Sequence, residues 1–160
     1  MADSLSDTSL YPLPTYNFLV RMDYLNSGRS EAIRCARVSG LEWNFDTLTY
    51  RDGLSFLGGE RITKYYISTY HPITLEQGTV ARDSLLVDWL RDVSTVPWAF
   101  TAIRSINVQL LDSEQLPVMT WKFHKAMATK ISGPQLDAHS DEVAIDRLEL
   151  QVASVQVTRS

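Results

Sequence analysis

SINVQLLDSEQLPVMTWKFH, residues 105–124, is the stretch of sequence that decides the fold. Apolar and polar side chains alternate on both sides of a turn-forming segment around Asp112 to Glu114. Such alternation is typical of strands with one buried face, and turn residues between two such runs predict a β-hairpin. The side chains expected to face the core are Ile106, Val108, Leu110, Met119, Trp121 and Phe123.

The same alternation recurs on either side of this hairpin. Upstream, the predicted strands cover residues 16–24, 31–38, 41–50, 61–70 and 73–75. Turn residues 26–28 join the first two of them into another hairpin, and Pro72 separates the last two. Downstream, Leu148, Leu150 and Val152 alternate with polar residues, so the chain is expected to close with one long strand.

A single segment has helical spacing. Within residues 83–93, apolar side chains recur at intervals of three and four positions, which predicts an amphipathic helix. We therefore expect a mainly β protein, an antiparallel β-barrel or sandwich of about seven strands with one flanking α-helix. Residues 1–15, with Pro12 and Pro14, predict an extended N-terminal arm, and residues 16–160 a single domain.

Composition and charge exclude several classes of protein. Fifteen Lys and Arg against 19 Asp and Glu give a net charge of −4, which argues against neutralising the phosphates of a nucleic acid. The single cysteine, Cys35, has no partner for an internal disulfide. The N-terminal segment lacks the pattern of a signal peptide, and no segment has the ~20 apolar residues of a membrane helix. We expect a chain that folds in the cytoplasm, without stable membrane insertion.

No pattern in the sequence predicts catalysis. The histidines, His71, His124 and His139, have no ligand-like spacing, and no nucleophile elbow, phosphate loop or dinucleotide motif is present. Asp141 and Glu142 are adjacent, so on a strand they would face opposite ways. Cys35 alternates with Ile33 and is expected to be a buried small side chain. We therefore predict no catalytic residues, no metal site and no cofactor.

Short motifs nevertheless follow one another in a distinctive order over most of the chain. They are Tyr11-Pro12-Leu13-Pro14 with Tyr16-Asn17-Phe18-Leu19-Val20, Val38-Ser39-Gly40-Leu41, Tyr50-Arg51-Asp52-Gly53, Ile73-Thr74-Leu75 with Gly78, Asp88-Trp89-Leu90-Arg91-Asp92-Val93, Leu110-Leu111-Asp112, Thr120-Trp121-Lys122-Phe123, and Ser132-Gly133-Pro134 with Ser140-Asp141-Glu142-Val143-Ala144-Ile145. Each is weak alone. In this order they resemble the inner tube proteins of contractile phage tails and of phage-like extracellular contractile injection systems.

Three segments depart from that resemblance. Residues 26–31 make the first hairpin longer, residues 60–70 look like an insertion rich in tyrosine, and Glu76-Gln77 replaces a pair that is commonly basic. They leave two positions open: the repeating shaft of the tube, or a specialised tube-initiator ring at the baseplate.

The resemblance implies hexameric rings that stack into a hollow tube, which sheath contraction pushes through a target envelope. It implies sheath and baseplate proteins as partners, and cargo or DNA that passes the lumen without specific binding. The particle would be assembled in the cytoplasm and then form part of a phage tail or a released injection particle. Pairing of strand edges around a ring would also protect the open edges of an antiparallel sheet.

The resemblance and the residues together suggest two kinds of site. Apolar side chains on a glycine-containing loop need a partner surface, and such a loop follows Tyr50. The expected inter-ring contacts are Tyr11, Pro12, Tyr50, Arg51, Asp52, Gly53, Leu54, Phe56 and Leu57. The lumen candidates are the polar strand residues Thr120, Lys122, Arg147, Glu149 and Gln151.

The residues alone leave two alternative functions possible. One is a small-molecule-binding β-barrel, which needs a hollow apolar interior. The other is an enzyme that assembles its site from scattered Ser, His and Asp residues.

Overall fold

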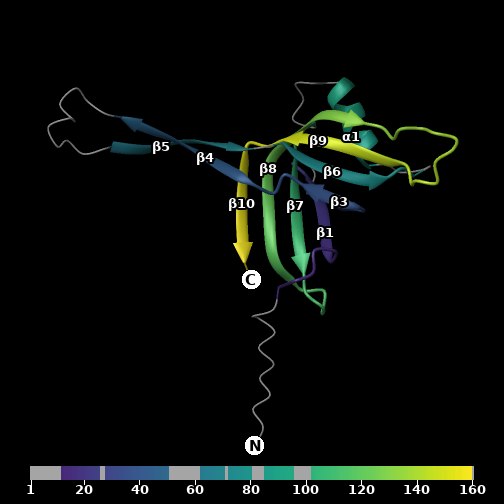
Figure 1. The fold of residues 1–160 in the computed structure, drawn as a ribbon, viewed down its shortest axis with the longest axis horizontal. Coiled ribbons are helices and arrows are strands. Elements are labelled where there is room, and N and C mark those ends of the chain that lie inside the picture. Colours follow the sequence, from purple (N-terminus) through teal and green to yellow (C-terminus); the bar gives the residue numbers. More distant parts are fainter. Residues whose placement is uncertain are drawn as a thin grey trace, which may run out of the picture.

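The computed structural model describes residues 12–25, 28–50, 62–70, 72–80, 85–95 and 102–159, of which 43–50 and 62–70 are described by their backbone only. These residues form strands and one helix (Figure 1). In chain order the elements are β1 (Phe18–Tyr24), β2 (Ser30–Ile33), β3 (Arg37–Ser39), β4 (Trp43–Tyr50), β5 (Ile62–Tyr70), β6 (Ile73–Gly78), α1 (Leu85–Thr95), β7 (Arg104–Leu111), β8 (Pro117–Ser132), β9 (Ile145–Gln151) and β10 (Ser154–Arg159).

Eight strands form one antiparallel sheet in the order β2-β1-β7-β8-β9-β6-β3, with β10 paired to β8 beside this path. The long strand β8 takes part in two portions of this sheet. The first part of β8 pairs with β7 and β10, and its residues 127–132 pair with β9. We call β2, β1, β7, the first part of β8 and β10 half-sheet A, and the rest of β8, β9, β6 and β3 half-sheet B.

The turn of β8 from one half-sheet to the other lies at Lys125. This residue has a φ of 52°, in the left-handed region that side chains other than glycine seldom adopt. The register against β7 shifts nearby, and Ala153 donates its N–H to the carbonyl oxygen of His124 at 3.1 Å. The last strand therefore bends with β8, which divides the long C-terminal strand predicted from the sequence into β9 and β10.

The two half-sheets share one core. Half-sheet A contributes Met22, Ile106 and Phe123, and half-sheet B contributes Leu75 and Leu148, all at most 1% exposed. These residues alternate with polar neighbours along each strand, as a half-buried strand requires. The hairpin predicted over residues 105–124 is confirmed, because Ile106 lies opposite Phe123 and Val108 opposite Trp121.

Helix α1 closes one side of this core. Its buried residues are Leu86 and Trp89, and the Trp89 Nε1 donates to the carbonyl oxygen of Ala102 at 2.7 Å. Arg104 is buried beneath the helix, with its guanidinium 4.5 Å from the Tyr24 ring centroid and 5.1 Å from that of Trp89, and it forms an ion pair with Asp92. A cation held over two rings and paired with a helix carboxylate fixes α1 on half-sheet A.

The β4–β5 hairpin is a separate two-stranded sheet, with a bulge between Phe45 and Asp46. It extends away from the main sheet, whereas the other strands gather around the core (Figure 1). It is the one described part of the fold that forms a sheet of its own outside the shared core.

The fold class is confirmed as mainly antiparallel β with one helix, but two details differ from the expectation. The predicted strand over residues 31–38 is two strands, β2 and β3, at opposite ends of the sheet path. The Cys35 N–H donates to the Ile33 oxygen, and the Ala36 N–H donates to the Glu76 oxygen of β6. The chain therefore leaves its pairing with β1 at this point and begins to pair with β6. In the described residues β2 and β3 do not pair, and the sheet stays open.

Candidate functional site

Half-sheet A ends in β2 on one side and β10 on the other, and neither strand has a second partner among the described residues. The Ala153 N–H points toward β8, at His124. By the register of the sheet, the N–H groups of Ser154, Gln156 and Thr158 bond to β8, so those of Val155, Val157 and Arg159 point to the open edge. Free backbone donors and acceptors of this kind are a template for pairing with another chain.

Between these two edges, the outward face of half-sheet A is polar. Lys122 lies opposite Asn107 of β7 and Gln156 of β10, and Thr120 lies opposite Gln109 and Thr158. On the same face, the Asn107 side chain donates to the Asp23 carboxylate at 2.5 Å. Two of the lumen candidates, Thr120 and Lys122, thus belong to one polar surface that crosses β1, β7, β8 and β10.

The other three lumen candidates lie elsewhere. Arg147, Glu149 and Gln151 lie on β9 and alternate with its buried residues, so they share the outward face of half-sheet B. There the Arg147 Nε donates to Glu76 Oε1 at 3.0 Å, and the Lys130 Nζ pairs with Glu149 Oε1 at 3.3 Å. Because the core separates the half-sheets, the structure does not bring the two sets of candidates together.

A side-chain clamp fixes the place where the chain enters β1. The Asn17 side chain donates to the Asp112 oxygen at 2.6 Å, and its own Oδ1 accepts from the Gln115 Nε2 at 3.1 Å. The Leu111 N–H donates to the Asn17 oxygen at 2.9 Å. These bonds fasten the end of the N-terminal arm to the β7–β8 turn.

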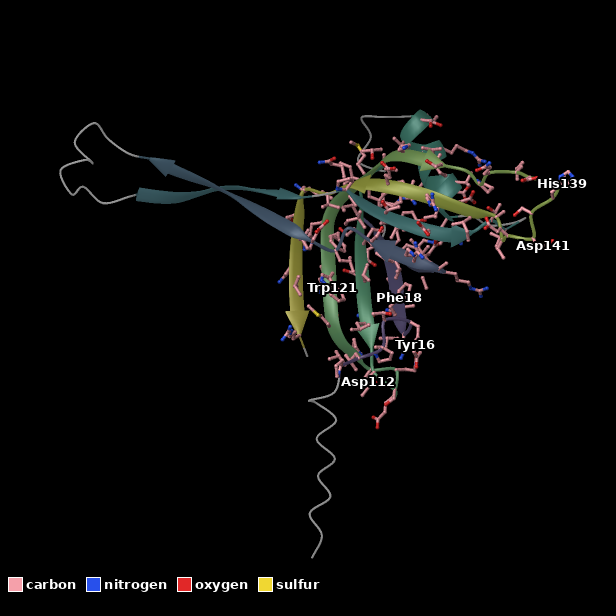
Figure 2. All side chains as sticks on the ribbon, in the orientation of Figure 1. Tyr16, Phe18, Asp112, Trp121, His139 and Asp141 are labelled. Carbon is pink, nitrogen blue, oxygen red and sulfur yellow. The ribbon has the colours of Figure 1, made fainter. Side chains whose placement is uncertain are left out.

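An apolar groove of about 580 Å³ begins at this clamp and runs between half-sheet A and β3. Figure 2 shows Tyr16, Phe18 and Trp121 along this side of the molecule. The residues that line the groove are Thr15, Tyr16, Phe18, Cys35, Ala36, Arg37, Val38, Leu41, Val108, Leu110 and Trp121. Burial raises the pKa of the Cys35 thiol to about 12, so this thiol is neutral at ordinary pH. We call this surface the β1–β3 groove.

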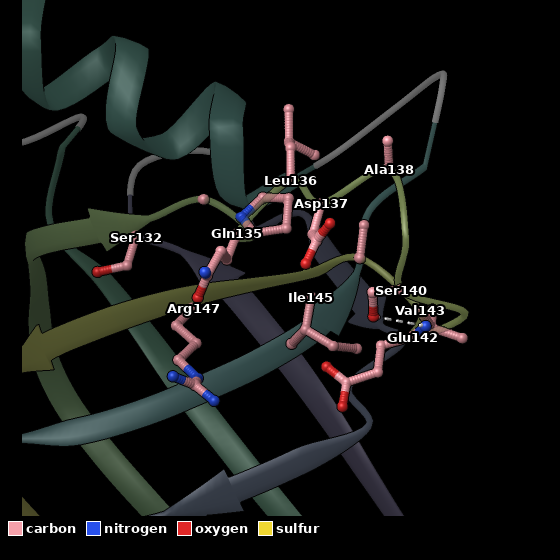
Figure 3. A pocket seen from close by; sticks show the side chains of 13 residues that line it. Ser132, Gln135, Leu136, Asp137, Ala138, Ser140, Glu142, Val143, Ile145 and Arg147 are labelled. Atoms are coloured by element: carbon pink, nitrogen blue, oxygen red, sulfur yellow. Dashed lines mark hydrogen bonds between the residues drawn. The ribbon is translucent and has the colours of Figure 1, made fainter.

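A larger pocket, of about 880 Å³, lies under the β8–β9 loop (Figure 3). It is lined mainly by residues of the loop, in which the Glu142 N–H donates to the Ser140 Oγ at 3.2 Å, and by Arg147 of β9. Two large apolar side chains of the loop face solvent, Leu136 at 86% and Val143 at 76% exposure. Among the described hydrogen bonds, none joins a nucleophile to a base in the lining of this pocket.

The candidate chemical groups considered from the sequence lie apart. His124 is exposed on β8, and His139 is exposed in the β8–β9 loop, 3.6 Å from Asp137. Asp141 and Glu142 are exposed in the same loop, and His71 lies outside the described residues. In the described ranges no group of His, Cys, Asp and Glu could hold a metal ion, and no helix there is long and apolar enough to cross a membrane.

The expected inter-ring residues are only partly within the described structure. Pro12 is exposed, and Tyr50 ends β4, where its backbone pairs with Ile62. Tyr11, Arg51, Asp52, Gly53, Leu54, Phe56 and Leu57 lie outside the described residues.

Reasoning from the sequence did not find the Asn17 clamp or the β1–β3 groove. Asn17 stands in a strand-like pattern, and its partners at Asp112 and Gln115 are distant in sequence. The groove combines β1, β3 and β7, whose adjacency depends on the split of residues 31–38. No local pattern in the sequence marks Tyr16 as exposed, although the structure leaves it 83% exposed at this groove.

An open antiparallel sheet with two edges unpaired among the described residues, together with a projecting hairpin, is typical of β proteins that associate through their strand edges. The model of the T4-like virus tail tube protein gp19 family matches residues 14–156. No curated protein matches this sequence.

Solved structures resemble the chain over all or most of its length. A chain in the sheath–tube complex of the extracellular contractile injection system PVC, in its extended state, is 26% identical, with 99% of this chain and 100% of that chain covered and a TM-score of 0.81. A chain in the tube-terminating cap of the anti-feeding prophage is 25% identical, with both chains fully covered and a TM-score of 0.80. A chain in the PVC sheath/tube terminator is 28% identical over 92% of this chain and 97% of that chain, with a TM-score of 0.78.

The chain belongs to the T4-like virus tail tube protein family. It is a tube protein of the kind found in contractile injection systems, which confirms the resemblance seen in its motifs. This family is structural, and neither the ligand-binding barrel nor the enzyme has comparable support.

Proposed function

We propose that six copies of this chain close into a ring, in which β10 of one subunit pairs with β2 of the next. The observation that carries this proposal is the pair of open edges on either side of one polar face. Such pairing would satisfy the free N–H groups of β10, and a contact between two different surfaces closes into a ring when the rotation permits.

In this ring the outward face of half-sheet A lines the lumen. Thr120 and Lys122 then face the lumen, while Arg147, Glu149 and Gln151 lie on the far side of the core. The polar side chains and the presence of both charge signs on this face suit a wall that cargo or DNA passes without specific binding.

Rings stack through the arm at Tyr11 and Pro12 and through the loop from Tyr50 to Leu57. The loop follows β4, which extends away from the core and so suits contact with a neighbouring ring (Figure 1). Burial of Leu54, Phe56 and Leu57 would contribute about 25 cal/mol per Å² of apolar area. Repetition around a ring makes such contacts cooperative.

The proposal assigns this chain a structural and non-catalytic role, with residues 1–15 as an arm and 16–160 as one domain. Its partners are sheath and baseplate proteins, as in the sheath–tube complex that it resembles. Assembly takes place in the cytoplasm, before the tube becomes part of a phage tail or a released particle.

Of the two positions in the tube, we propose the repeating shaft and not the initiator ring. The chain in the sheath–tube complex aligns with 99% of this chain at a TM-score of 0.81. A chain in the anti-feeding prophage baseplate is 23% identical, aligns with 93% of this chain at a TM-score of 0.76, and supports the fold alone. A shaft subunit is expected to polymerise alone into long tubes, whereas an initiator stops at one ring.

The test of ring closure uses Val157→Pro. Proline removes an N–H that points to the open edge of β10, and edge positions tolerate it, so the fold should persist while ring closure is lost. Native mass spectrometry and negative-stain images should show hexamers for the original chain and monomers for the variant. The control, Val157→Thr, keeps the N–H and should form rings. Hexamers of Val157→Pro would refute pairing at this edge.

Stacking is tested separately with the double substitution Phe56→Asp, Leu57→Asp. Charged side chains cannot be buried in an apolar contact without a large desolvation cost. We expect single rings instead of tubes, with unchanged circular dichroism. Tubes of unchanged length would refute the role of this loop.

A further inference from the structure

We propose that the β1–β3 groove of one subunit binds the N-terminal segment, residues 1–11, of a second copy of this chain. This inference rests on the proposed function, in which copies assemble into a tube. It adds the surface that receives the arm, which the proposed function leaves unassigned.

The groove is an uncovered apolar surface that begins where the arm ends. Phe18, Leu41 and Trp121 are only partly buried along it, and Val108 at its floor is 2% exposed. Half-sheet B covers the rest of the inner face of half-sheet A but leaves this part open. A surface of this kind is stabilised when another segment removes it from water.

The described end of the arm is fixed beside the groove, where Thr15 and Tyr16 line it. The Asn17 clamp fixes the chain at the β7–β8 turn, and Pro12 and Pro14 favour extended backbone on the way out. Eleven extended residues reach up to about 36 Å, enough to meet a neighbouring copy. Tyr16 lines the groove and is yet 83% exposed, so its ring is free to contact an incoming segment.

The charges of arm and groove are complementary. Residues 1–11 carry the acidic Asp3 and Asp7, the apolar Leu5, Leu10 and Tyr11, and no basic side chain. The one charged residue that lines the groove is Arg37, with a side chain 69% exposed. Its partner Glu76 lies 3.9 Å away and is closer to Arg147, at 3.0 Å, so the Arg37 guanidinium is available to an incoming carboxylate.

A charge exchange tests this contact in the full chain. Arg37→Glu should reduce the number of long tubes about tenfold or more, because repulsion at each groove acts around every ring. Adding Asp3→Lys and Asp7→Lys to Arg37→Glu should restore long tubes. The control, Arg34→Glu, changes an exposed arginine that does not line the groove and should have no effect.

A cysteine trap identifies the occupant. Ala36 lines the groove and is exposed, so Leu10→Cys combined with Ala36→Cys, in a Cys35→Ser background, should form a disulfide when assembled tubes are treated with diamide as the oxidant. Arms exchanged between copies give a ladder of linked chains on a non-reducing gel, and the same chain with Ala36 retained gives none. A faster-migrating monomer would overturn the proposal in favour of the subunit's own arm.

Two further results would overturn the inference while leaving the proposed function intact. One is the absence of a ladder in Leu10→Cys combined with Ala36→Cys, together with normal tubes for Arg37→Glu. In the other, Asp3→Lys and Asp7→Lys fail to restore tubes to Arg37→Glu, and a ladder of linked chains forms only when the cysteine is placed in the β4–β5 hairpin. That result would make the hairpin the segment that occupies the groove. Absence of tubes from the original chain would instead refute the proposed function itself.

Discussion

Half-sheet A and the β4–β5 hairpin have the same kind of sequence, with apolar and polar residues in alternation. Half-sheet A is covered by half-sheet B and by α1, whereas the hairpin is a two-stranded sheet of its own that extends from the molecule (Figure 1). An isolated two-stranded hairpin is marginally stable in water. The difference teaches that alternation specifies a strand but not whether the same chain supplies its covering layer.

The strongest test of this difference is Trp89→Ala. Trp89 is fully buried and donates to the Ala102 oxygen, so its loss leaves a cavity and an unpaired carbonyl. We expect the free energy of unfolding to fall by about 3–5 kcal/mol, measured by urea denaturation. The hairpin-loop substitutions Phe56→Asp and Leu57→Asp should change it by less than about 0.5 kcal/mol. If Trp89→Ala and the hairpin-loop substitutions lowered the free energy of unfolding by similar amounts, the two regions would not differ in their contribution to stability.

The attachment of α1 is tested by Asp92→Asn. This change leaves the buried Arg104 cation without its carboxylate partner, although Asp92 is 48% exposed and solvent screens part of the pair. We expect a loss of about 1–2 kcal/mol. Asp88→Asn provides the control, since Asp88 pairs with Arg91 at 3.5 Å on the helix surface and should contribute less than about 0.5 kcal/mol. Equal effects would show that Arg104 does not depend on Asp92.

The inner wall of the groove can be followed through Cys35. Its pKa is raised from 9.0 to about 12 by burial, so above pH 9 the unfolded chain loses a proton that the folded chain keeps. Stability should therefore fall as pH rises through this window, by about 1.4 kcal/mol per pH unit. Cys35→Ala should lack this contribution when the two chains are compared by urea denaturation. An identical pH dependence would show that the thiol is accessible to water.

The smallest expected effect is a gain. Lys125 has a positive φ at the corner of β8, where glycine would relieve strain but would also raise the entropy of the unfolded chain. Lys125→Gly should stabilise the protein by about 0.5–1 kcal/mol in thermal unfolding, and Lys125→Ala should not. A loss with glycine would mean that the side chain of Lys125 supports the corner.

Much of the fold could be predicted because its signals are local. The strands of residues 105–124 pair through a turn in which Asp112 Oδ1 accepts from the N–H groups of Glu114 and Leu116. The helix predicted over residues 83–93 is α1 at Leu85–Thr95, because its apolar stripe packs on the core; residues 83 and 84 lie outside the described structure.

The assembly surfaces were less predictable because they depend on contacts between distant segments. Thr120 and Arg147 both looked like polar strand residues, and only the pairing of their strands separates them onto different half-sheets. The Asn17 clamp joins residues that are 95 positions apart in sequence. The inter-ring role of Tyr11, Pro12 and the loop from Tyr50 to Leu57 stays a prediction.

By itself, the sequence determined the strand pattern, the single helix and the family, because periodicity and short motifs are written along the chain. Tertiary structure alone decided which edges stay unpaired, where β8 bends, and which apolar residues form a groove instead of a core. The physical reason is that burial depends on which segments meet in three dimensions, and alternation is the same whether the covering layer comes from this chain or from another copy.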